Sequence, residues 1–467
     1  MKKQIALSFC AAMLLFASCE KNKNNTPAPT PDNSKNIVVV EGDITKNTTW
    51  SADKKYLLKG FVYVTKGATL TIEPGTIIMG DKPSKGTLTI TRGSKIDAEG
   101  TEDKPIIFTS AVEAGARREG DWGGIILLGK APVNPDGGEA KIEGGLTPTN
   151  ASDEKSYIWY GGNNANDNSG TLKYVRIEFA GIPFSPDNEI NGLTFGGVGS
   201  GTTISYVQVY RSGDDAFEWF GGTVHCDHLV AAYTWDDDFD TDFGFSGQIQ
   251  FGVALRAKNI ADVSGSNGFE SDNDGDGSTH MPQTKAIFSN MTIVGPINGT
   301  SASGINANFQ HAAQIRRNSS ISIRNSVLMG FPVGLYIDET KGASTSANAL
   351  NGTLRFANNI IAGCPTPLKT SNTSFDIESW ANLNNNTLLT STDNVKLKDP
   401  FKFSSSIAAA GNTGRPDFLL QSGSPAGSGA NFKGLNGFQA IDYIGAFDAT
   451  NDWTANWTTW DAENTEY

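Results

Sequence analysis

An internal repeat near the amino terminus constrains the fold more than any other feature of this chain. Residues 68–75 (ATLTIEPG) and 86–93 (GTLTITRG) match at an offset of 18 positions. In both segments two apolar residues alternate with polar ones and a glycine follows, which is typical of a short strand that ends in a tight turn. A second short strand after each glycine would complete one coil of a solenoid. The repeat therefore predicts a stack of β-coils.

Strand-length apolar segments recur along the rest of the chain, and no stretch of helical periodicity competes with them. They lie at 105–110, 122–128, 172–179, 204–210, 286–294, 321–329 and 354–362. Asparagines that follow apolar triplets suit a ladder at the turns, and they are Asn290, Asn325, Asn358 and Asn359. We predict an all-β, single-stranded, right-handed parallel β-helix over residues 36–448, with coils about 4.8 Å apart. A β-sandwich with coincidental repeats is the alternative.

The first residues read as a targeting segment. Lys2 and Lys3 precede an apolar run at 5–16, which is too short to span a membrane and suits a signal peptide. The segment 15–19 (LFASC) resembles a bacterial lipobox, although leucine is commoner than the phenylalanine at its second position. We therefore predict a lipoprotein signal peptide at 1–18, followed at 19–35 by a lipidated Cys19 and a flexible tether. An ordinary secretory signal with a chance cysteine is the alternative.

Charge excludes some partners. The chain has a formal net charge of −13 at pH 7, and its pI is near 4.9. Nucleic-acid binding needs basic patches, so no nucleic-acid partner is expected. Cys226 and Cys364 are expected to be buried free thiols, because nothing in the sequence brings them together.

The acidic centre of the chain contains the candidate functional residues. Its three clusters are Asp214 and Asp215; Asp236, Asp237 and Asp238 with Asp240 and Asp242; and Asp272, Asp274 and Asp276. Asp215 and Asp238 are 23 positions apart, about one coil, so the first two clusters can lie side by side. Carboxylates that close repel each other unless a cation bridges them or one holds a proton.

Calcium is one interpretation of these acids. The segment 272–277 (DNDGDG) places oxygen donors at alternate positions, as at the start of a calcium-binding EF-hand loop. The closing glutamate of such a loop is missing, because the twelfth position is Gln283. We predict a partial Ca²⁺ site with ligands Asp272, Asp274 and Asp276, and a solvated acidic turn is the alternative.

Catalysis is the second interpretation. The segment 212–215 (SGDD) resembles the G-D-D element of polygalacturonase-type glycosidases, but the other motifs of that family are missing. Asp215 and Asp238 are the candidate acid and base of a hydrolase, if they lie at the separation that inverting hydrolysis needs. A lyase would need a basic residue near a Ca²⁺-bound uronate, and Arg256, Lys258, Arg316 and Arg317 qualify by residue type alone.

Ligand capture without chemistry is the third interpretation. Aromatic rings are interleaved with the acids, and rings beside carboxylates bind sugar faces or cationic ligands. The predicted ligand-binding surface consists of Asp214, Asp215, Glu218, Trp219, Trp235, Asp236, Asp238 and Asp240. The tryptophans could instead belong to the core of the solenoid.

The C-terminal segment 449–467 carries three of the nine tryptophans. The end of a solenoid exposes strand edges and apolar core that must be covered. We therefore predict that this segment is an aromatic cap over the last coil. A ligand-binding tail is the alternative.

The pattern in residues 57–110, the segment 212–252 and the ending at 424–447 resemble Bacteroidetes outer-membrane lipoproteins of the pectin-lyase-like β-helix type. The resemblance implies an outer-membrane location, often beside a TonB-dependent receptor, and the acid after Cys19 resembles the surface-export signal of such lipoproteins. We expect a lipid-anchored protein at the cell surface that captures a ligand such as a polysaccharide, or supports a receptor, and is stabilised by Ca²⁺. A polysaccharide hydrolase or lyase, or a purely structural surface protein, are the alternatives.

Overall fold

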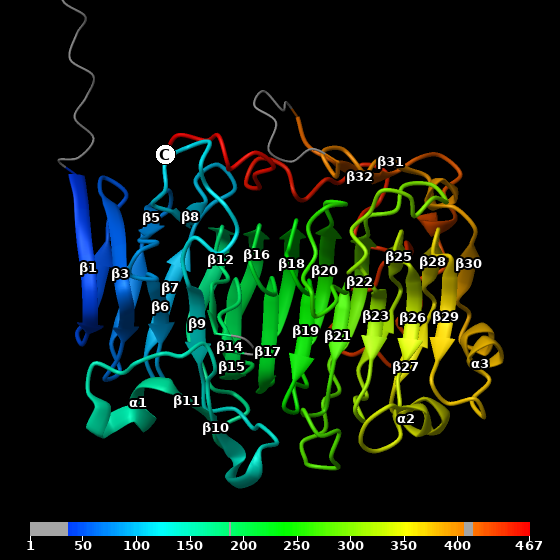
Figure 1. The fold of residues 1–467 in the computed structure, drawn as a ribbon, viewed down its shortest axis with the longest axis horizontal. Coiled ribbons are helices and arrows are strands. Elements are labelled where there is room, and N and C mark those ends of the chain that lie inside the picture. Colours follow the sequence, from blue (N-terminus) through cyan, green and yellow to red (C-terminus); the bar gives the residue numbers. More distant parts are fainter. Residues whose placement is uncertain (1–35, 186–187, 406–413) are drawn as a thin grey trace, which may run out of the picture. The chain divides into compact units, whose positions relative to one another are not determined.

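The described chain winds into a stack of coils whose strands pair in parallel (Figure 1). The computed structural model describes residues 36–185, 188–405 and 414–467. The predicted signal peptide, Cys19 and tether lie outside these residues. None of the helices within them is long and apolar enough to cross a membrane.

Three ladders of parallel strand pairs run along the stack. The first consists of β1 (Ile37–Ile44), β3 (Lys55–Val64), β6 (Thr87–Ile90), β9 (Gly124–Leu128), β15 (Leu193–Val198), β17 (Phe217–Gly222), β19 (Phe239–Asp242), β21 (Phe269–Ser271), β23 (His311–Ile315), β26 (Val333–Ile337) and β29 (Thr366–Thr370). The second consists of β2 (Thr48–Trp50), β4 (Thr69–Ile72), β7 (Lys95–Glu99), β12 (Gly170–Glu178), β16 (Thr203–Tyr210), β18 (His225–Ala232), β20 (Gln248–Leu255), β22 (Ile287–Val294), β24 (Ser322–Arg324) and β27 (Arg355–Ala357).

The third ladder shares several long strands with the other two. It contains parts of β1, β3, β12, β16, β18, β20 and β22, together with β5 (Ile77–Gly80), β8 (Ile106–Ser110), β25 (Val327–Met329), β28 (Ile360–Ala362) and β30 (Thr387–Leu389). These ladders confirm the predicted all-β, right-handed parallel β-helix.

The repeat that predicted the solenoid joins two sides of the stack rather than two successive coils. Residues 68–75 contain β4 and residues 86–93 contain β6, which belong to different ladders. Leu70 pairs with Ile96, 26 positions later, and not with Leu88. A coil here is therefore longer than the offset of 18.

Apolar side chains from all three ladders fill the inside of the coils. Successive coils place aromatic rings over one another, as with Phe217, Phe239 and Phe269, whose neighbouring centroids are 5.7 and 5.4 Å apart. Cys226 and Cys364 are buried and free, as predicted. Apolar burial of this kind is the main stabilising contribution to such a fold.

A column of residues with positive φ marks the bend between the second and third ladders. Tyr174, Tyr206, His228 and Phe251 occupy it in the earlier coils, and their rings stack face to face. Asparagines occupy it in the later coils, at Asn290, Asn325, Asn358 and Asn385. Asparagine tolerates this backbone region better than most residues. The predicted asparagine ladder is confirmed at the first three of these positions.

Residues 429–467, which we call the C-terminal strap, run back along this bend column (red in Figure 1). Near its start, the backbone N–H of Asn431 donates to Oδ1 of Asn325, at 2.8 Å. Farther on, Trp453 packs on His228, and Trp457 packs on Tyr206.

The prediction of an aromatic cap over the last coil was wrong about the location. The tryptophans do cover apolar surface, but that surface belongs to the rings on β12, β16 and β18, in the first half of the chain. Beyond β28, the short helix α3 (Ile377–Leu383) instead packs Ile377 against the main core.

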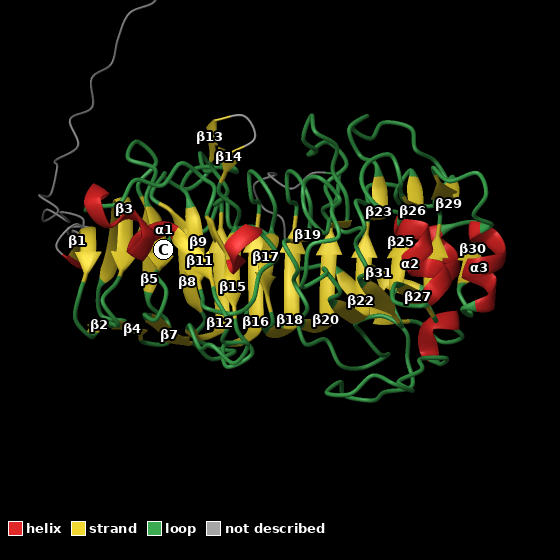
Figure 2. Ribbon diagram, turned by 90° about the horizontal axis from the view of Figure 1, so that it is seen from below, coloured by secondary structure: helices red, strands yellow, loops and turns green. Residues whose placement is uncertain are grey.

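An insertion at 129–169 covers part of the outer face of the first ladder. It contains β10 (Glu139–Lys141), α1 (Glu154–Ile158) and β11 (Trp159–Gly161) and lies beside β9 and β15 (Figure 2). Tyr157, Ile158 and Tyr160 form an apolar cluster with Ile126 and Leu128. The other described strands and α-helices are β13 (Pro183–Ser185), β14 (Asn188–Glu189), α2 (Thr345–Asn351), β31 (Leu397–Asp399) and β32 (Asp417–Leu420).

Candidate metal centre on an acidic face

Strand register places acidic side chains in line on the outer face of the first ladder. Glu218 of β17 pairs with Asp240 of β19, and Asp240 pairs with Glu270 of β21. Neighbouring strands are about 4.8 Å apart, so carboxylates in one register position are forced close together. We call the acids around this line, namely Asp214, Asp215, Glu218, Asp236, Asp237, Asp240, Asp242 and Glu270, the acidic face.

A second line of polar residues precedes the same strands and ties the coils together. Oδ1 of Asp215 accepts a hydrogen bond from the backbone N–H of Asp237, at 2.8 Å. Oδ1 of Asp237 accepts one from the backbone N–H of Asn267, and Oδ1 of Asn267 accepts one from that of His311. These bonds hold the carboxylates of Asp215 and Asp237 in fixed positions.

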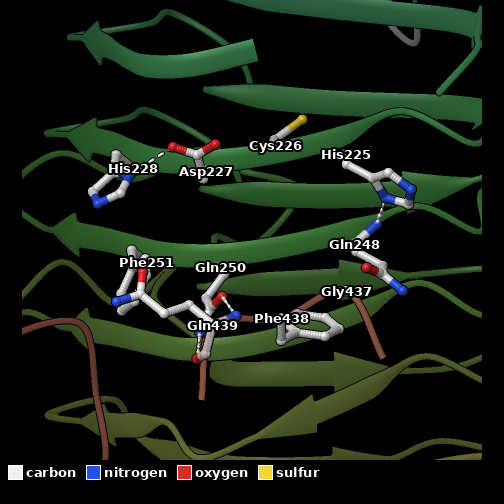
Figure 3. Close-up of a pocket in the computed structure, with 10 residues that line it drawn as sticks. All are labelled: His225, Cys226, Asp227, His228, Gln248, Gln250, Phe251, Gly437, Phe438 and Gln439. Atoms are coloured by element: carbon white, nitrogen blue, oxygen red, sulfur yellow. Dashed lines mark hydrogen bonds and ion pairs between the residues drawn. The ribbon is translucent and has the colours of Figure 1, made fainter. Parts of the chain in front are cut away.

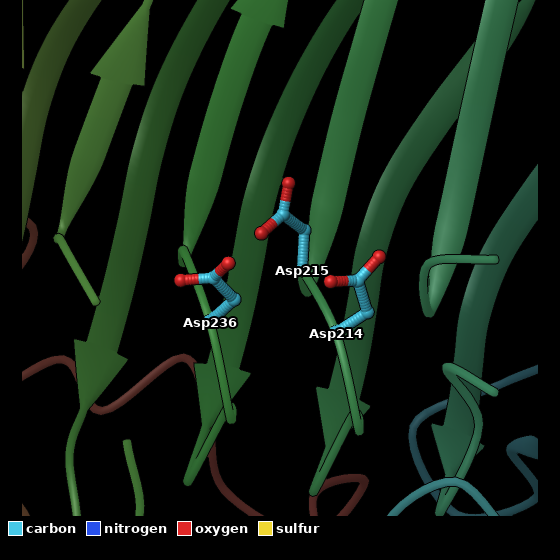
Figure 4. A group of neighbouring side chains, drawn as sticks. All are labelled: Asp214, Asp215 and Asp236. Carbon is cyan, nitrogen blue, oxygen red and sulfur yellow. The ribbon is translucent and has the colours of Figure 1, made fainter. Parts of the chain in front are cut away.

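Asp215 lies at the centre of two groups of carboxylates that are close enough to share a cation. Ligand oxygens of Asp214, Asp215 and Asp236 all lie within 4.8 Å of one another, on neighbouring coils (Figure 4). The same limit holds for Asp215, Glu218 and Asp240. The two groups share Asp215 and together contain five carboxylates, and such all-oxygen sets suit hard divalent cations.

Burial makes this crowding costly for the ionised forms. It raises the pKa well above the ordinary carboxyl range, and neighbouring carboxylates raise it further, for Asp214, Asp215, Glu218, Asp237, Asp240 and Asp242. Burial also raises the pKa of Asp236 to about 6 and that of Glu270 to about 8. The acidic face therefore holds protons unless a cation compensates its charge.

Several oxygens in this region accept no hydrogen bond from any residue that the structure describes. They are Oδ1 of Asp236, Oδ1 of Asp240 and Oδ1 of Asn191, and all three atoms are buried. Asn191 is only 1% exposed, and its Nδ2 donates to Glu218, which places the amide beside the group of Asp215, Glu218 and Asp240. Buried polar atoms usually have a partner, so these oxygens point to a cation or protons.

Two arginines flank the acidic face on the side of the later coils. Arg316 pairs with Glu270 and, through Nε, with Oδ1 of Asp272 at 2.8 Å. Nη1 of Arg317 lies 2.6 Å from Oδ2 of Asp272. Asp272 thus has its charge compensated by protein groups, unlike the acids around Asp215.

The structure does not bring the three predicted calcium ligands together. Asp272 is engaged by the two arginines, and Oδ1 of Asp274 accepts from the backbone N–H groups of Asp276 and Ser278. The side chain of Asp276 is 90% exposed and lies 3.1 Å from Nζ of Lys341. Among the described residues, the carboxylate groups close enough to share a cation do not include these three.

Two predicted ligand-binding residues have to be corrected, because both are inside the coils. Trp219 is 0% exposed and stacks between the rings of Phe195 and Phe245 in the core. Asp238 is also 0% exposed and pairs with the equally buried Arg256, with Oδ1 3.1 Å from Nη1. Asp215 and Asp238 therefore do not face a common substrate, and the register pairs Asp215 with Asp237 instead.

Trp235 remains half-buried beside the acidic face. Its indole N–H donates to Oδ1 of Asp262 at 2.9 Å, and its ring packs on the cluster that the strap covers. The indole donor therefore already has a partner within the chain.

A separate cavity of about 400 Å³ lies between the second ladder and the strap (Figure 3). His225 and His228 are three positions apart on β18, and residues at this spacing in a regular strand point to opposite faces. His228 has a positive φ, so the alternation breaks there and both rings line this cavity. Nδ1 of His225 accepts from the backbone N–H of Gln248, and Nδ1 of His228 contacts Asp227.

Sequence reasoning missed two acids of this region. Glu270 lies outside the predicted clusters, and only the register of β21 places it in line with Glu218 and Asp240. Glu143 comes from the insertion, where no repeat indicates its position. Burial raises the pKa of Glu143 to about 7, although a hydrogen bond with Glu218 lowers it.

The coils and the acidic face together define a parallel β-helix protein with a candidate cation site on its outer surface. Comparison with family models agrees, because residues 42–404 match the pectate-lyase-like β-helix domain. This match spans most of the chain, which therefore belongs to the pectate-lyase-like β-helix family. No curated protein and no solved structure matches the chain.

Proposed function

We propose that this protein captures a ligand, without chemical turnover, through a divalent cation held on the acidic face. The observation that carries the proposal is the pair of carboxylate groups that share Asp215: within each group the ligand oxygens lie within sharing distance, and nearby buried oxygens have no partner among the described residues. A bound cation would relieve the repulsion among these acids and would satisfy the unpaired oxygens.

Calcium fits this set best among the common cations. The groups around Asp215 contain only carboxylates, and Ca²⁺ accepts six to eight oxygen ligands in flexible geometry. Zinc and copper prefer nitrogen or sulfur ligands, which these groups lack. The backbone bond to Oδ1 of Asp215 leaves Oδ2 of the same carboxylate for the cation.

The ligand we propose is an acidic polysaccharide. Asp214, Asp236 and Asp240 are only partly buried, so a cation that they hold can remain accessible from solvent. Such a cation can accept a carboxylate or hydroxyl oxygen of a sugar as a further ligand. Without the cation, the acidic face would repel an anionic polymer.

We also propose that the chain is anchored by lipid on Cys19 and displayed at the outer membrane, with a TonB-dependent receptor as its partner. The apolar run at 5–16, the segment LFASC at 15–19 and the resemblance to surface lipoproteins support this proposal. A capture protein tethered there would raise the local concentration of a polysaccharide for its neighbour.

A polysaccharide hydrolase or lyase is the second candidate, and one observation favours it. Glu143 and Glu218 come from different elements and share a hydrogen bond, and burial raises the pKa of both carboxyls, so the pair can hold the proton that a general acid needs. This candidate rests on Glu143, Glu218 and Asp215, because Asp238 is inside the coils.

One experiment separates the two candidates. The full chain, purified in detergent, is titrated with Ca²⁺ by calorimetry and then offered acidic and neutral polysaccharides with Ca²⁺ or with EDTA. Calcium-dependent binding without new reducing ends or unsaturated-uronate absorbance is the expected result. Turnover that Glu143→Gln abolishes would overturn the capture proposal in favour of the enzyme. Absence of both binding and turnover would overturn both.

A further inference from the structure

Four basic side chains line one cavity beside the second ladder. The cavity has a volume of about 350 Å³ and lies between the second ladder and the C-terminal strap. Its basic residues are Lys285, Arg324, Arg355 and Lys433. In a chain of net charge −13, such a cluster of cations is unexpected.

Strand register and the strap together build this cavity. Ser322 of β24 pairs with Arg355 of β27, and Arg324 lies two positions after Ser322, so its side chain leaves the strand on the same face. The strap brings Lys433 to the same place, because the backbone N–H of Asn431 donates to Oδ1 of Asn325. The cations therefore come from three coils and the strap.

Arg324 belongs to the wall of the cavity and is not a solvent-exposed surface charge. Its residue is only 8% exposed, and its Nε is buried with no hydrogen-bond partner among the described residues. Its Nη2 has one long contact, 3.4 Å, to the backbone carbonyl of Asn431. A buried guanidinium group with an unused donor is costly unless a ligand completes its hydrogen bonds.

Within the described residues, no carboxylate lies within 4.0 Å of the charged nitrogens of these four side chains. Burial lowers the pKa of Arg324, and the positive charge of Arg355 lowers it further. An anion in the cavity would reverse both effects, because it would compensate charge in a partly desolvated position.

We propose that this cavity binds an oxoanion, a phosphate or sulfate group. Arginine presents several N–H donors in a planar fork that matches the oxygens of such groups, and lysines add charge without a fixed geometry. Four unpaired cations suit a divalent anion better than a single carboxylate. Ile287 and Leu435 also line the cavity, so the group can be carried by an organic ligand. This site is independent of the proposed calcium site.

Calorimetry on the full chain tests the proposal, with inorganic phosphate, sulfate and acetate as probes. The buffer has fixed ionic strength and contains EDTA, which removes any contribution of cations on the acidic face. We expect saturable binding of phosphate and sulfate, with acetate bound more weakly. Arg324→Gln and Arg355→Gln should each weaken binding about tenfold or more.

Lys95→Gln is the matched control, because Lys95 is an exposed cation outside the cavity and should leave the affinity unchanged. Arg355 is exposed, so Arg355→Gln keeps the test valid if Arg324→Gln does not fold. Absence of saturable binding, equal binding of acetate, or an equal loss in Lys95→Gln would overturn the proposal. Dextran sulfate, with dextran as its uncharged control, identifies the source of the oxoanion. Binding of dextran sulfate would indicate that the oxoanion is carried by a polysaccharide, and binding of inorganic ions alone would indicate a free ion.

Discussion

Oδ1 of Asp215 accepts a hydrogen bond from the backbone N–H of Asp237 in the next coil, at 2.8 Å. The same carboxylate belongs to both groups of acids that are close enough to share a cation. Asp215 is therefore part of the architecture through one oxygen and available to a ligand through the other. This double role makes its charge and its hydrogen bond separable by mutation.

Asp215→Asn should weaken Ca²⁺ binding by about tenfold or more. Mutation of a residue that only supports a metal ligand already weakens metal binding by this much, and Asp215 would be a ligand itself. The amide oxygen can still accept from Asp237, so the coil contact survives. Metal-free protein should melt at a higher temperature than wild type, because the amide stays neutral in the crowded site without having to take up a proton. Calorimetry with Ca²⁺ and melting in EDTA measure the two effects. Asp276→Asn, at an exposed position, is the control and should leave the affinity for Ca²⁺ unchanged. Equal Ca²⁺ affinities in wild type and Asp215→Asn would contradict the proposed cation site.

The metal-free protein should lose stability as pH rises from about 5 to about 9. A carboxyl whose pKa is higher in the folded chain holds its proton more tightly there, so its contribution to stability is lost as pH rises through the folded pKa. The pKa values of Asp236, Glu143 and Glu270, about 6, 7 and 8, fall in this window. Saturating Ca²⁺ should flatten the dependence, because it compensates the ionised acids.

Scanning calorimetry in EDTA and in Ca²⁺ measures this pH dependence. Glu270→Gln should reduce the slope in EDTA, mainly at the alkaline end of the window. A melting temperature that rises between pH 5 and 9 without metal would show that the acids are not crowded as described.

Asp238→Ala should reduce the free energy of unfolding by about 3 kcal/mol or more, because it leaves Arg256 as an unpaired charge inside the coils. Denaturant unfolding measures the loss. The double variant Asp238→Leu with Arg256→Met should recover much of it, since no buried charge remains. If Asp238→Ala instead abolished ligand binding with no loss of stability, the internal placement of Asp238 would be contradicted.

Trp457→Ala should reduce the free energy of unfolding by about 3–5 kcal/mol, because a fully buried ring is removed from the strap. Hydrogen exchange should accelerate at β12 and β16, which the ring contacts, and not at β28 and β30. Trp380→Ala, near the last coils, is the comparison and should show the reverse pattern. Faster exchange at β28 in Trp457→Ala would instead indicate that the C-terminal tryptophans cover the last coil, and it would contradict their placement on β12 and β16.

Much of the fold could be predicted because strand periodicity is local. Alternating apolar residues mark strands such as β4 and β6 without any knowledge of their partners. The alternation also contained an unused signal at the site: Glu218 and Trp219 are adjacent in one strand, so only one of them can face outward. The pairing of Asp215 with Asp237 rather than Asp238 depended on a register that loops of unequal length obscure.

The sequence by itself determined that this chain is a parallel β-helix, because the side-chain pattern of each strand already encodes which face is buried. It also determined that the acids gather in the middle of the chain. Only the tertiary structure decided which acids meet, because contacts between coils depend on the length of every turn. It likewise placed Glu143 beside Glu218, and the strap along the side of the coils, since neither position repeats.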